Sequence, residues 1–459
     1  MDFPDELGPS AEHVTCRAAQ APVQGSIRPP GSKSITNRAL ACAALASGPS
    51  KLNGALASED TRVMIDGLTS LGAPVEEADG GATLRVDGCG GALDRAFASR
   101  ADIFVGNSGA TIRFITPLIV AACAGRDIEI RLDGVPRMRE RPIGDLVDAL
   151  RQQGAAIAYE KNDGYPPITI RRGGLRGGDC SVRGETSSQF LSGLLMAAPY
   201  ARDSLRLHLT STLVSQPYVT MTLAVMRAFG ATAERLSADA TPGGFGGYSI
   251  DHAARYQGRQ YAIEPDASAA SYFWAAAAVT GGTVTVEGLS RDALQGDVAF
   301  CECLARMGCL VEYDAAAPAI TVRGGRLRGI TADMGDISDT AQTLASVALF
   351  AEGPTTIRNI AHVRHKESDR IGDLARELRK LGAAVEEFED GLTLTPLPSA
   401  FAYQPATLKT YRDHRMAMSF AVAGLRIDGL KILDPACTAK TYPGFWQDWA
   451  KLTSLDREK

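Results

Sequence analysis

The sequence has few aromatic residues, no excess of basic residues and no long apolar run. Aromatic side chains make up 6% of the 459 residues, and the formal net charge is −5 at pH 7. Few aromatic rings are available to stack on bases, and an acidic balance disfavours a nucleic-acid surface. No stretch reaches the roughly 18 to 20 charge-free residues that a membrane span needs. We therefore expect no nucleic-acid partner and no membrane contact.

Metal-binding and disulfide patterns are also missing. The nine cysteines are odd in number and scattered, and none forms a C-x-x-C pair. His362 and His365 lie close together, but no second cluster completes a metal site. We therefore expect no metal. The cysteine pattern indicates reduced thiols, and the N-terminus is acidic, unlike a targeting peptide, so both features predict a cytoplasmic protein. Residues 1–13 are expected to form a loose extension.

The chain contains two interleaved series of repeated segments. Amphipathic segments that end in a glycine, as a helix with a left-handed C-cap does, span 62–72, 143–154, 219–230, 298–308 and 371–382. Ala- and Leu-rich segments, which predict buried helices, begin near Ser34, Ser108, Ser187, Asp266, Ser338 and Asp413. Both series recur about every 72 to 82 residues, so six units of about 76 residues (459/6) fill the chain.

Strand patterns lie between these helices. Residues 128–132 and 283–286 alternate with period two, and 155–159 with 168–170 resembles a hairpin. One unit therefore reads as buried helix, strand, amphipathic helix and hairpin. The last unit has only a short amphipathic segment, 445–452, so it needs the N-terminal end of the chain.

The predicted fold is α/β, with two similar domains that each hold three repeats around buried parallel helices, an inside-out α/β barrel. One domain is inserted at residues 32–260, and the other combines 1–31 with 261–459. Pro- and Gly-rich stretches mark two crossings, at 29–31 and 243–259, and these would form a hinge. We expect the active site in the cleft between the domains.

Polar and charged residues gather where the buried helices start. The first helix opens with Lys33, Ser34, Asn37 and Arg38, and similar groups open the others. A charge run is more often a solvated face, but here the groups recur at equivalent helix N-termini, which attract anions. Arg-rich loops at 136–142 and 364–370 add groups that suit carboxylate and phosphate. The pattern favours a site for small, multiply anionic ligands.

Several of these segments resemble one enzyme family. They are residues 30–38, 106–109, 136–143, 187–190, 366–370, 413–418 and 437–441. In these motifs, and from about Val14 to Leu452, the chain is similar to 5-enolpyruvylshikimate-3-phosphate synthases. The resemblance implies a transferase of the shikimate pathway of aromatic amino acid biosynthesis. Such an enzyme transfers the enolpyruvyl group of phosphoenolpyruvate to the 5-hydroxyl of shikimate 3-phosphate through a tetrahedral intermediate, without a cofactor.

The resemblance also implies residue roles. Asp339 would be the base for the 5-hydroxyl and Glu367 the proton donor, with Lys33 sharing this work. Shikimate 3-phosphate would bind Lys33, Ser34, Arg38, Ser187, Ser188, Gln189, Ser215, Tyr218, Asp339, His362 and Lys366. Phosphoenolpyruvate would bind Lys33, Asn107, Gly109, Arg137, Gln189, Arg370, Arg415 and Lys440. Because carboxylates among cations ionise easily, an acid role for Glu367 needs desolvation or a bound anion.

The chain departs from the family pattern at four positions. His362 replaces a common Asn, Gln216 replaces a Lys, and Ala110 and Phe114 replace a Thr and a Pro after Gly109. Because the last two lie beside the predicted phosphoenolpyruvate pocket, the response to the inhibitor glyphosate is left open. The role of Arg113, a further match to the family, is left open too. One alternative is UDP-N-acetylglucosamine enolpyruvyl transferase, which uses a loop cysteine that has no counterpart here. Another is a non-catalytic repeat scaffold, which would not explain cations at helix starts. We expect a monomer.

Overall fold

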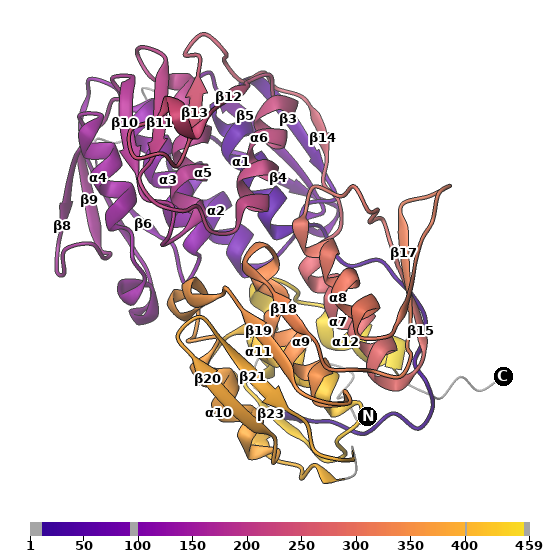
Figure 1. Cartoon of the computed structure of the whole chain (residues 1–459). Helices are drawn as coiled ribbons and strands as arrows, with labels where there is room; N and C mark the ends of the chain where they lie inside the picture. The colour runs from indigo at the N-terminus through magenta and orange to yellow at the C-terminus, as the bar shows by residue number, and fades with distance from the viewer. Residues whose placement is uncertain (1–11, 92–99, 400–401, 454–459) are drawn as a thin grey trace. The chain divides into compact units, whose positions relative to one another are not determined.

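The computed structural model describes residues 12–91, 100–399 and 402–453, and these form two compact units (Figure 1). The terminal unit combines both chain ends, Met1–Pro30 and Glu264–Lys459, and the inserted unit is Gly31–Ile263. The second boundary thus follows residue 263, where the sequence had suggested 260. Within the described ranges, no helix has the length and apolar character that crossing a membrane requires.

The inserted unit alternates helices and strands. Its helices are α1 (Lys33–Leu45), α2 (Glu59–Ser70), α3 (Gly109–Ala122), α4 (Gly144–Gln152), α5 (Ser188–Ala197) and α6 (Gln216–Ala228). Its strands are β3 (Ser47–Asn53), β4 (Val75–Ala78), β5 (Thr83–Cys89), β6 (Arg100–Phe104), β7 (Asp127–Asp133), β8 (Ala156–Tyr159), β9 (Ile168–Arg172), β10 (Gly178–Val182), β11 (Leu205–Leu209), β12 (Ala233–Leu236), β13 (Gly247–Ile250) and β14 (Gln260–Ala262).

The strands of this unit form sheets with one shared topology. The orders are β14-β3-β5-β4, β6-β7-β9-β8 and β10-β11-β13-β12. In each sheet the first pair is parallel and the other two pairs are antiparallel. Since β14 comes from the end of the unit and pairs with β3 at its start, the last strand completes the sheet of the first repeat.

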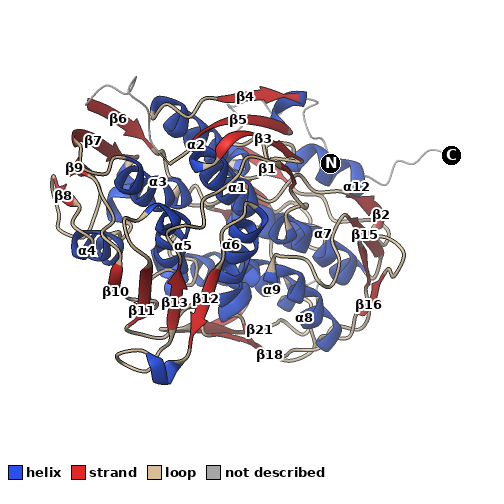
Figure 2. Cartoon of the chain, turned by 90° about the horizontal axis from the view of Figure 1, so that it is seen from above, coloured by secondary structure: helices blue, strands red, loops and turns tan. Residues whose placement is uncertain are grey.

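The sheets lie outside a core of helices α1, α3 and α5 (Figure 2). All fourteen residues of α3 are buried, and α1 is buried from Ile35 to Leu45. Small side chains let the helices approach closely, because a Cβ added at Gly193 of α5 would lie 2.4 Å from the Arg113 backbone oxygen of α3. The helices that the sequence predicts to be apolar all round therefore form the centre of the unit.

The terminal unit repeats the same elements. Its helices are α7 (Ala267–Thr280), α8 (Phe300–Arg306), α9 (Ala341–Ala348), α10 (Gly372–Lys380), α11 (His414–Gly424) and α12 (Phe445–Thr453). Its strands are β1 (His13–Thr15), β2 (Gln24–Ile27), β15 (Thr283–Glu287), β16 (Leu310–Tyr313), β17 (Ala319–Arg323), β18 (Thr331–Asp333), β19 (Thr355–Arg358), β20 (Ala384–Phe388), β21 (Gly391–Thr395), β22 (Thr407–Leu408) and β23 (Lys431–Leu433). Helices α7, α9 and α11 pack together and are almost wholly buried.

The N-terminal end of the chain completes two sheets of the terminal unit. Strand β2 adds in parallel to β15 in the order β2-β15-β17-β16, and β18-β19-β21-β20 has the same topology. In the third sheet, β22 is parallel to β23, and β1 pairs antiparallel with β23 from the other side. This confirms six repeats of one α/β unit. The expected loose extension is wrong at His13, which pairs with Leu433, while residues 1–11 lie outside the described residues.

The ends of the helices follow from local chemistry. The glycines Gly72, Gly154, Gly230, Gly308 and Gly382 all have φ between +83° and +110°, which confirms the predicted helix ends. Five of the six buried helices begin with a capping side chain: Ser32, Ser108, Ser187, Asp266 and Asp413. The first cap is thus Ser32 rather than Ser34. Helix α9 instead follows a 3-10 turn, η6 (Gly335–Thr340).

Candidate active site

Arg370 is the centre of a charged cluster in the terminal unit. It precedes α10 and is only 3% exposed. Its Nε donates to Asp413 Oδ2 at 2.7 Å, Nη1 donates to Asp339 Oδ1 at 3.0 Å, and Nη2 donates to Glu367 Oε2 at 2.8 Å. Burial alone would lower the pKa of Arg370, but the three carboxylates together raise it above its ordinary value. The guanidinium therefore stays charged and holds three acidic groups around it.

Asp339 lies in η6 between two guanidinium groups. Arg415 Nη2 donates to Asp339 Oδ2 at 2.6 Å, and Arg415 Nη1 donates to the Asp339 backbone oxygen at 3.1 Å. Arg370 occupies the other carboxylate oxygen. The predicted base and two of the predicted phosphoenolpyruvate ligands are thus in direct contact.

Glu367 joins a third cation to this cluster. Lys440, at the end of the 3-10 turn η9 (Pro435–Lys440), places Nζ 3.5 Å from Glu367 Oε1. Both side chains are buried. Glu367 therefore lies between Lys440 and Arg370, and Coulomb attraction between these buried groups is only weakly screened by solvent.

His362 borders the same cluster. It lies in the 3-10 turn η7 (Ala361–His365), is 8% exposed, and its Nε2 is 3.0 Å from Ser338 Oγ. The pKa of His362 is lowered to about 4, mainly by burial and then by the charges of Lys366 and Arg370, while the charge of Asp339 opposes them. The imidazole is therefore neutral at pH 7. With Lys366 beside it, all seven residues predicted in the terminal unit fall in one region.

Asp413 is a member of this cluster for which the sequence predicted no role. It is fully buried and caps α11 by accepting from Arg415 N at 2.9 Å. It also accepts from Ser368 Oγ at 2.9 Å and from Arg370. An acidic residue before a buried helix is a cap signal in the sequence, but its bonds to Arg370 are not visible there. Asp413 thus joins the Arg370 side chain to the start of α11, where Arg415 lies.

The turn before Asp413 has an unusual backbone. Tyr411 and Arg412 have φ of +55° and +57°, a region that side chains other than glycine rarely adopt. Tyr411 OH donates to Glu377 Oε1 at 2.7 Å, and Lys409 N donates to Glu377 Oε2 at 2.9 Å. Glu377 is fully buried in α10. These bonds hold the strained turn, and so fix where Asp413 begins α11.

A second cluster lies in the inserted unit, where Arg38 is 2% exposed in α1. It donates to Thr222 Oγ1 at 2.7 Å, the Ser34 oxygen at 2.9 Å, the Tyr218 oxygen at 3.2 Å and Ser192 Oγ at 3.5 Å. All four acceptors are neutral, and burial lowers the pKa of Arg38 to about 10. Among the described residues, no carboxylate lies within ion-pair distance of it. A buried cation without a counter-ion favours a bound anion.

Arg113 organises the start of α5. Its Nη1 donates to Gln189 Oε1 at 2.8 Å and to Ser187 Oγ at 3.5 Å, and Nη2 donates to the Pro142 oxygen at 2.9 Å. Ser187 caps α5, and Ser188 is its first residue. The structure thus brings three predicted shikimate 3-phosphate ligands together around Arg113, whose role the sequence had left open.

Arg141 holds the residues at the start of α3 in place. Its Nη1 donates to the Asn107 backbone oxygen at 2.8 Å and to Asn107 Oδ1 at 3.2 Å. Gly109 is the first residue of α3, and a Cβ added there would lie 2.6 Å from Arg141 Nη2. The glycine therefore makes room for Arg141. The motif 136–143 contains this arginine, but no sequence signal connected it to Asn107.

The remaining predicted residues lie on the same unit. Lys33 begins α1 with Nζ 3.5 Å from Asp60 Oδ2, and Ser215, with φ +52°, caps α6. Arg137 lies in the 3-10 turn η2 (Pro136–Glu140), where its Nη1 donates to Glu140 Oε2 at 2.8 Å. Its side chain is partly exposed.

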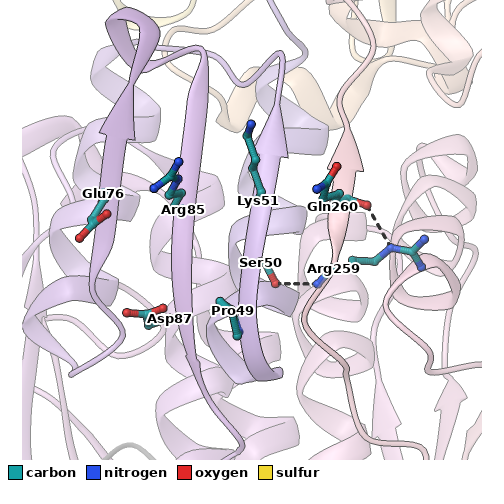
Figure 3. Close-up of a pocket in the computed structure, with 8 residues that line it drawn as sticks. All are labelled: Pro49, Ser50, Lys51, Glu76, Arg85, Asp87, Arg259 and Gln260. Atoms are coloured by element: carbon teal, nitrogen blue, oxygen red, sulfur yellow. Dashed lines mark hydrogen bonds between the residues drawn. The ribbon is translucent and has the colours of Figure 1, made fainter.

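A surface pocket of about 570 Å³ lies elsewhere on the inserted unit (Figure 3). It is lined by residues of the β14-β3-β5-β4 sheet and the segment before β14, namely Pro49, Ser50, Lys51, Glu76, Arg85, Asp87, Arg259 and Gln260. Its charges are of both signs. None of its lining residues is a predicted ligand, so this pocket and the predicted site are different places.

The family model and the curated relatives that match this chain share one description. The model of the family described as EPSP synthase (3-phosphoshikimate 1-carboxyvinyltransferase) matches residues 18–449. A 3-phosphoshikimate 1-carboxyvinyltransferase from Nostoc sp. is 45% identical over 439 residues, which cover 96% of this chain and 99% of that protein. One from Serratia proteamaculans is 45% identical over 440 residues, 94% of this chain and 97% of that protein. The solved structure of EPSP synthase from Acinetobacter baumannii is similar with a TM-score of 0.78 and 25% identity, covering 97% and 99% of the two chains.

Proposed function

This chain belongs to the EPSP synthase family, and from that premise we propose that it transfers the carboxyvinyl group of phosphoenolpyruvate to shikimate 3-phosphate and releases phosphate. The observation that carries the proposal is the terminal-unit cluster. There the carboxylate of Asp339 lies between the guanidinium groups of Arg370 and Arg415. A base that is surrounded by groups suited to carboxylate and phosphate is what this reaction requires.

The first step is an addition. Asp339 takes the proton of the 5-hydroxyl as the oxygen bonds to C2 of phosphoenolpyruvate, and the methylene carbon C3 gains a proton from Glu367 or Lys33. The product is a tetrahedral intermediate that still carries the phosphate. In the second step a proton leaves C3, the C2–O bond to phosphate breaks, and the double bond forms again. Asp339, Glu367 and Lys33 can therefore accept and donate every proton that these two steps transfer.

The cations stabilise the charges of both substrates. We assign phosphoenolpyruvate to five cations and three uncharged residues. The cations are Lys33 and Arg137 of the inserted unit and Arg370, Arg415 and Lys440 of the terminal unit, and the uncharged residues are Asn107, Gly109 and Gln189 of the inserted unit. Arg415 and Lys440 are buried, so an anion that displaces their carboxylate partners is only weakly screened by solvent. Once the anion has taken the place of these carboxylates, the positive groups stabilise the negative charge that develops in the transition state.

Shikimate 3-phosphate is assigned to Ser34, Ser187, Ser188, Gln189, Ser215, Tyr218, His362 and Lys366. The resemblance also implies that Arg38 is a ligand of shikimate 3-phosphate. The bonds of Arg38 to Thr222, Ser34, Tyr218 and Ser192 use four of the five N–H groups of its guanidinium, which leaves one for the substrate. We propose that Arg38 acts mainly through its charge.

The proposal requires both clusters to serve one reaction. We therefore propose that the two units close on their substrates, which would exclude water from the reacting groups. Small-angle scattering should show a smaller radius of gyration when both substrates are present. An unchanged radius would contradict closure.

A phosphate-release assay tests the reaction directly. The purified chain is incubated with phosphoenolpyruvate and either shikimate 3-phosphate or UDP-N-acetylglucosamine. We expect release with shikimate 3-phosphate alone, and we expect Lys33→Ala to abolish it while the circular dichroism spectrum is unchanged. Release only with the nucleotide sugar, or with neither acceptor, would refute the proposed function.

We further propose a cytoplasmic monomer. Seven of the cysteines that the structure describes are free thiols, which fits a reducing compartment: Cys16, Cys42, Cys123, Cys180, Cys301, Cys303 and Cys309. Size-exclusion chromatography with light scattering should give the 48.5 kDa of one chain, and twice that mass would contradict the proposal.

A further inference from the structure

Asp297 is a buried acidic residue next to the cluster that the reaction described above does not use. It is 3% exposed and lies in the 3-10 turn η5 (Gly296–Ala299), which packs against η6 and α7. It accepts a hydrogen bond from Ser268 Oγ. A buried carboxyl in this position needs an explanation, because isolated buried charges are costly.

The Ser268 hydroxyl connects Asp297 to the arginine beside the proposed base. Arg415 Nη2 donates to Ser268 Oγ at 3.4 Å, and the same nitrogen donates to Asp339 Oδ2 at 2.6 Å. Ser268 thus accepts from Arg415 and donates to Asp297. The three side chains form a continuous path from Asp297 to Asp339.

We propose that Asp297 is a positioning residue, which orients Arg415 through Ser268 and controls whether the Asp339 carboxyl holds a proton. The proposal rests on the function proposed above. Arg370 and Arg415 both stabilise the charged form of Asp339, which makes it a poor proton acceptor. A second carboxyl on the adjoining turn opposes the two arginines, since neighbouring carboxylates disfavour each other's ionisation.

The charges around Asp297 agree with this coupling. Burial raises the pKa of Asp297 well above its ordinary value, and the charges of Asp339 and Asp266 raise it too, whereas the bond from Ser268 and the charge of Arg415 lower it. Of the other acidic groups on the adjoining turn and helix, Asp336 and Glu302 are exposed to solvent. Asp339 thus disfavours the ionisation of Asp297, and the same interaction makes Asp297 disfavour the ionisation of Asp339.

The test uses Asp297→Asn, which can still accept the bond from Ser268 but carries no charge. The matched control is Asp336→Asn, on the same turn as Asp339 but exposed. In the full chain without substrates, 13C-carboxyl-labelled aspartates are titrated by NMR, and the Asp339 signal is assigned with Asp339→Asn. We expect Asp297→Asn to move the Asp339 titration to lower pH by about one unit, a tenfold change in proton affinity, and the control to leave it unchanged.

Kinetics supply the second measurement. In Asp297→Asn, the acidic limb of the kcat/KM profile should move to lower pH, and kcat at pH 7 should fall about 3- to 10-fold because the base is weaker. The KM for phosphoenolpyruvate should change less than twofold. Ser268→Ala should instead raise this KM, because Arg415 loses its second acceptor.

The results separate the two proposals. If the wild-type chain releases no phosphate, the proposed function fails, but the NMR titration still tests the pair. If the Asp339 signal titrates identically in the wild type and in Asp297→Asn, the inference is overturned, whatever the enzyme does. A purely structural role for Asp297 would lower the melting temperature of the variant while leaving the titration and the pH profile unmoved.

Discussion

His362 makes the stability of the terminal unit depend on pH in a way that can be measured. Its pKa is about 4 in the folded protein, against 6.5 for an ordinary imidazole. Between these values the unfolded chain holds a proton that the folded chain does not. The free energy of unfolding contributed by His362 is therefore complete above about pH 6.5 and is lost as the pH falls toward 4.

The size of the effect follows from the two pKa values. Their difference corresponds to about 3 kcal/mol in full, and about 2 kcal/mol is lost by pH 5. The variant His362→Asn can bond to Ser338 but takes up no proton in this range. We expect the wild type to lose about 2 kcal/mol more than the variant when the pH is lowered from 7.5 to 5.

Urea denaturation followed by tryptophan fluorescence is the suitable assay. The three tryptophans of the chain, Trp274, Trp446 and Trp449, all lie in the terminal unit with His362. The control is His365→Asn, in the same turn but exposed, which should follow the wild type. Carboxylates titrate in all three proteins and cancel in the comparison. Parallel curves for the wild type and His362→Asn would refute the assignment of a buried, neutral imidazole.

Three further changes test the clusters. Arg370→Lys replaces a guanidinium that donates to three carboxylates with a single ammonium group. Urea denaturation should therefore show that the free energy of unfolding falls by about 3 kcal/mol, and an unchanged midpoint would contradict this. Gly109→Ala places a Cβ 2.6 Å from Arg141 Nη2, so steady-state kinetics should show a several-fold higher KM for phosphoenolpyruvate, and an unchanged KM would remove this loop from the site. Tyr411→Phe leaves Glu377 Oε1 without its hydroxyl donor and should cost about 1 to 2 kcal/mol in urea, whereas no loss would mean that the turn is not held by this bond.

The fold could be predicted because its signals are local. A glycine that ends an amphipathic helix needs only its own left-handed φ, and Gly154 and Gly308 have φ of +98° and +110°. The prediction of where α9 starts is less accurate. The sequence suggested a helix from about Ser338, but Ile337 has φ −127° and a 3-10 turn runs to Thr340. That turn brings Asp339 to Arg370, a contact made by distant parts of the chain, so local propensity could not predict it.

The site could be predicted as a set of residues but not as a set of bonds. The family motifs contain Asn107, Gln189 and Arg370 by resemblance. Their partners Arg141, Arg113 and Asp413 are 34, 76 and 43 residues away in the sequence. No periodicity connects residues so far apart. Only the packing of the repeats decides which arginine meets which acceptor.

These bonds separate the arginines into two kinds. Arg113 and Arg141 donate to neutral amide and carbonyl oxygens of Gln189, Pro142 and Asn107. Arg370 and Arg415 donate to carboxylates, and an arriving phosphate or carboxylate competes for the same N–H groups. The first kind can hold Gln189 and Asn107 in place through a reaction cycle. The second kind can exchange a carboxylate of the protein for a bound anion, and in the reaction that we propose this exchange would free Asp339 to accept a proton.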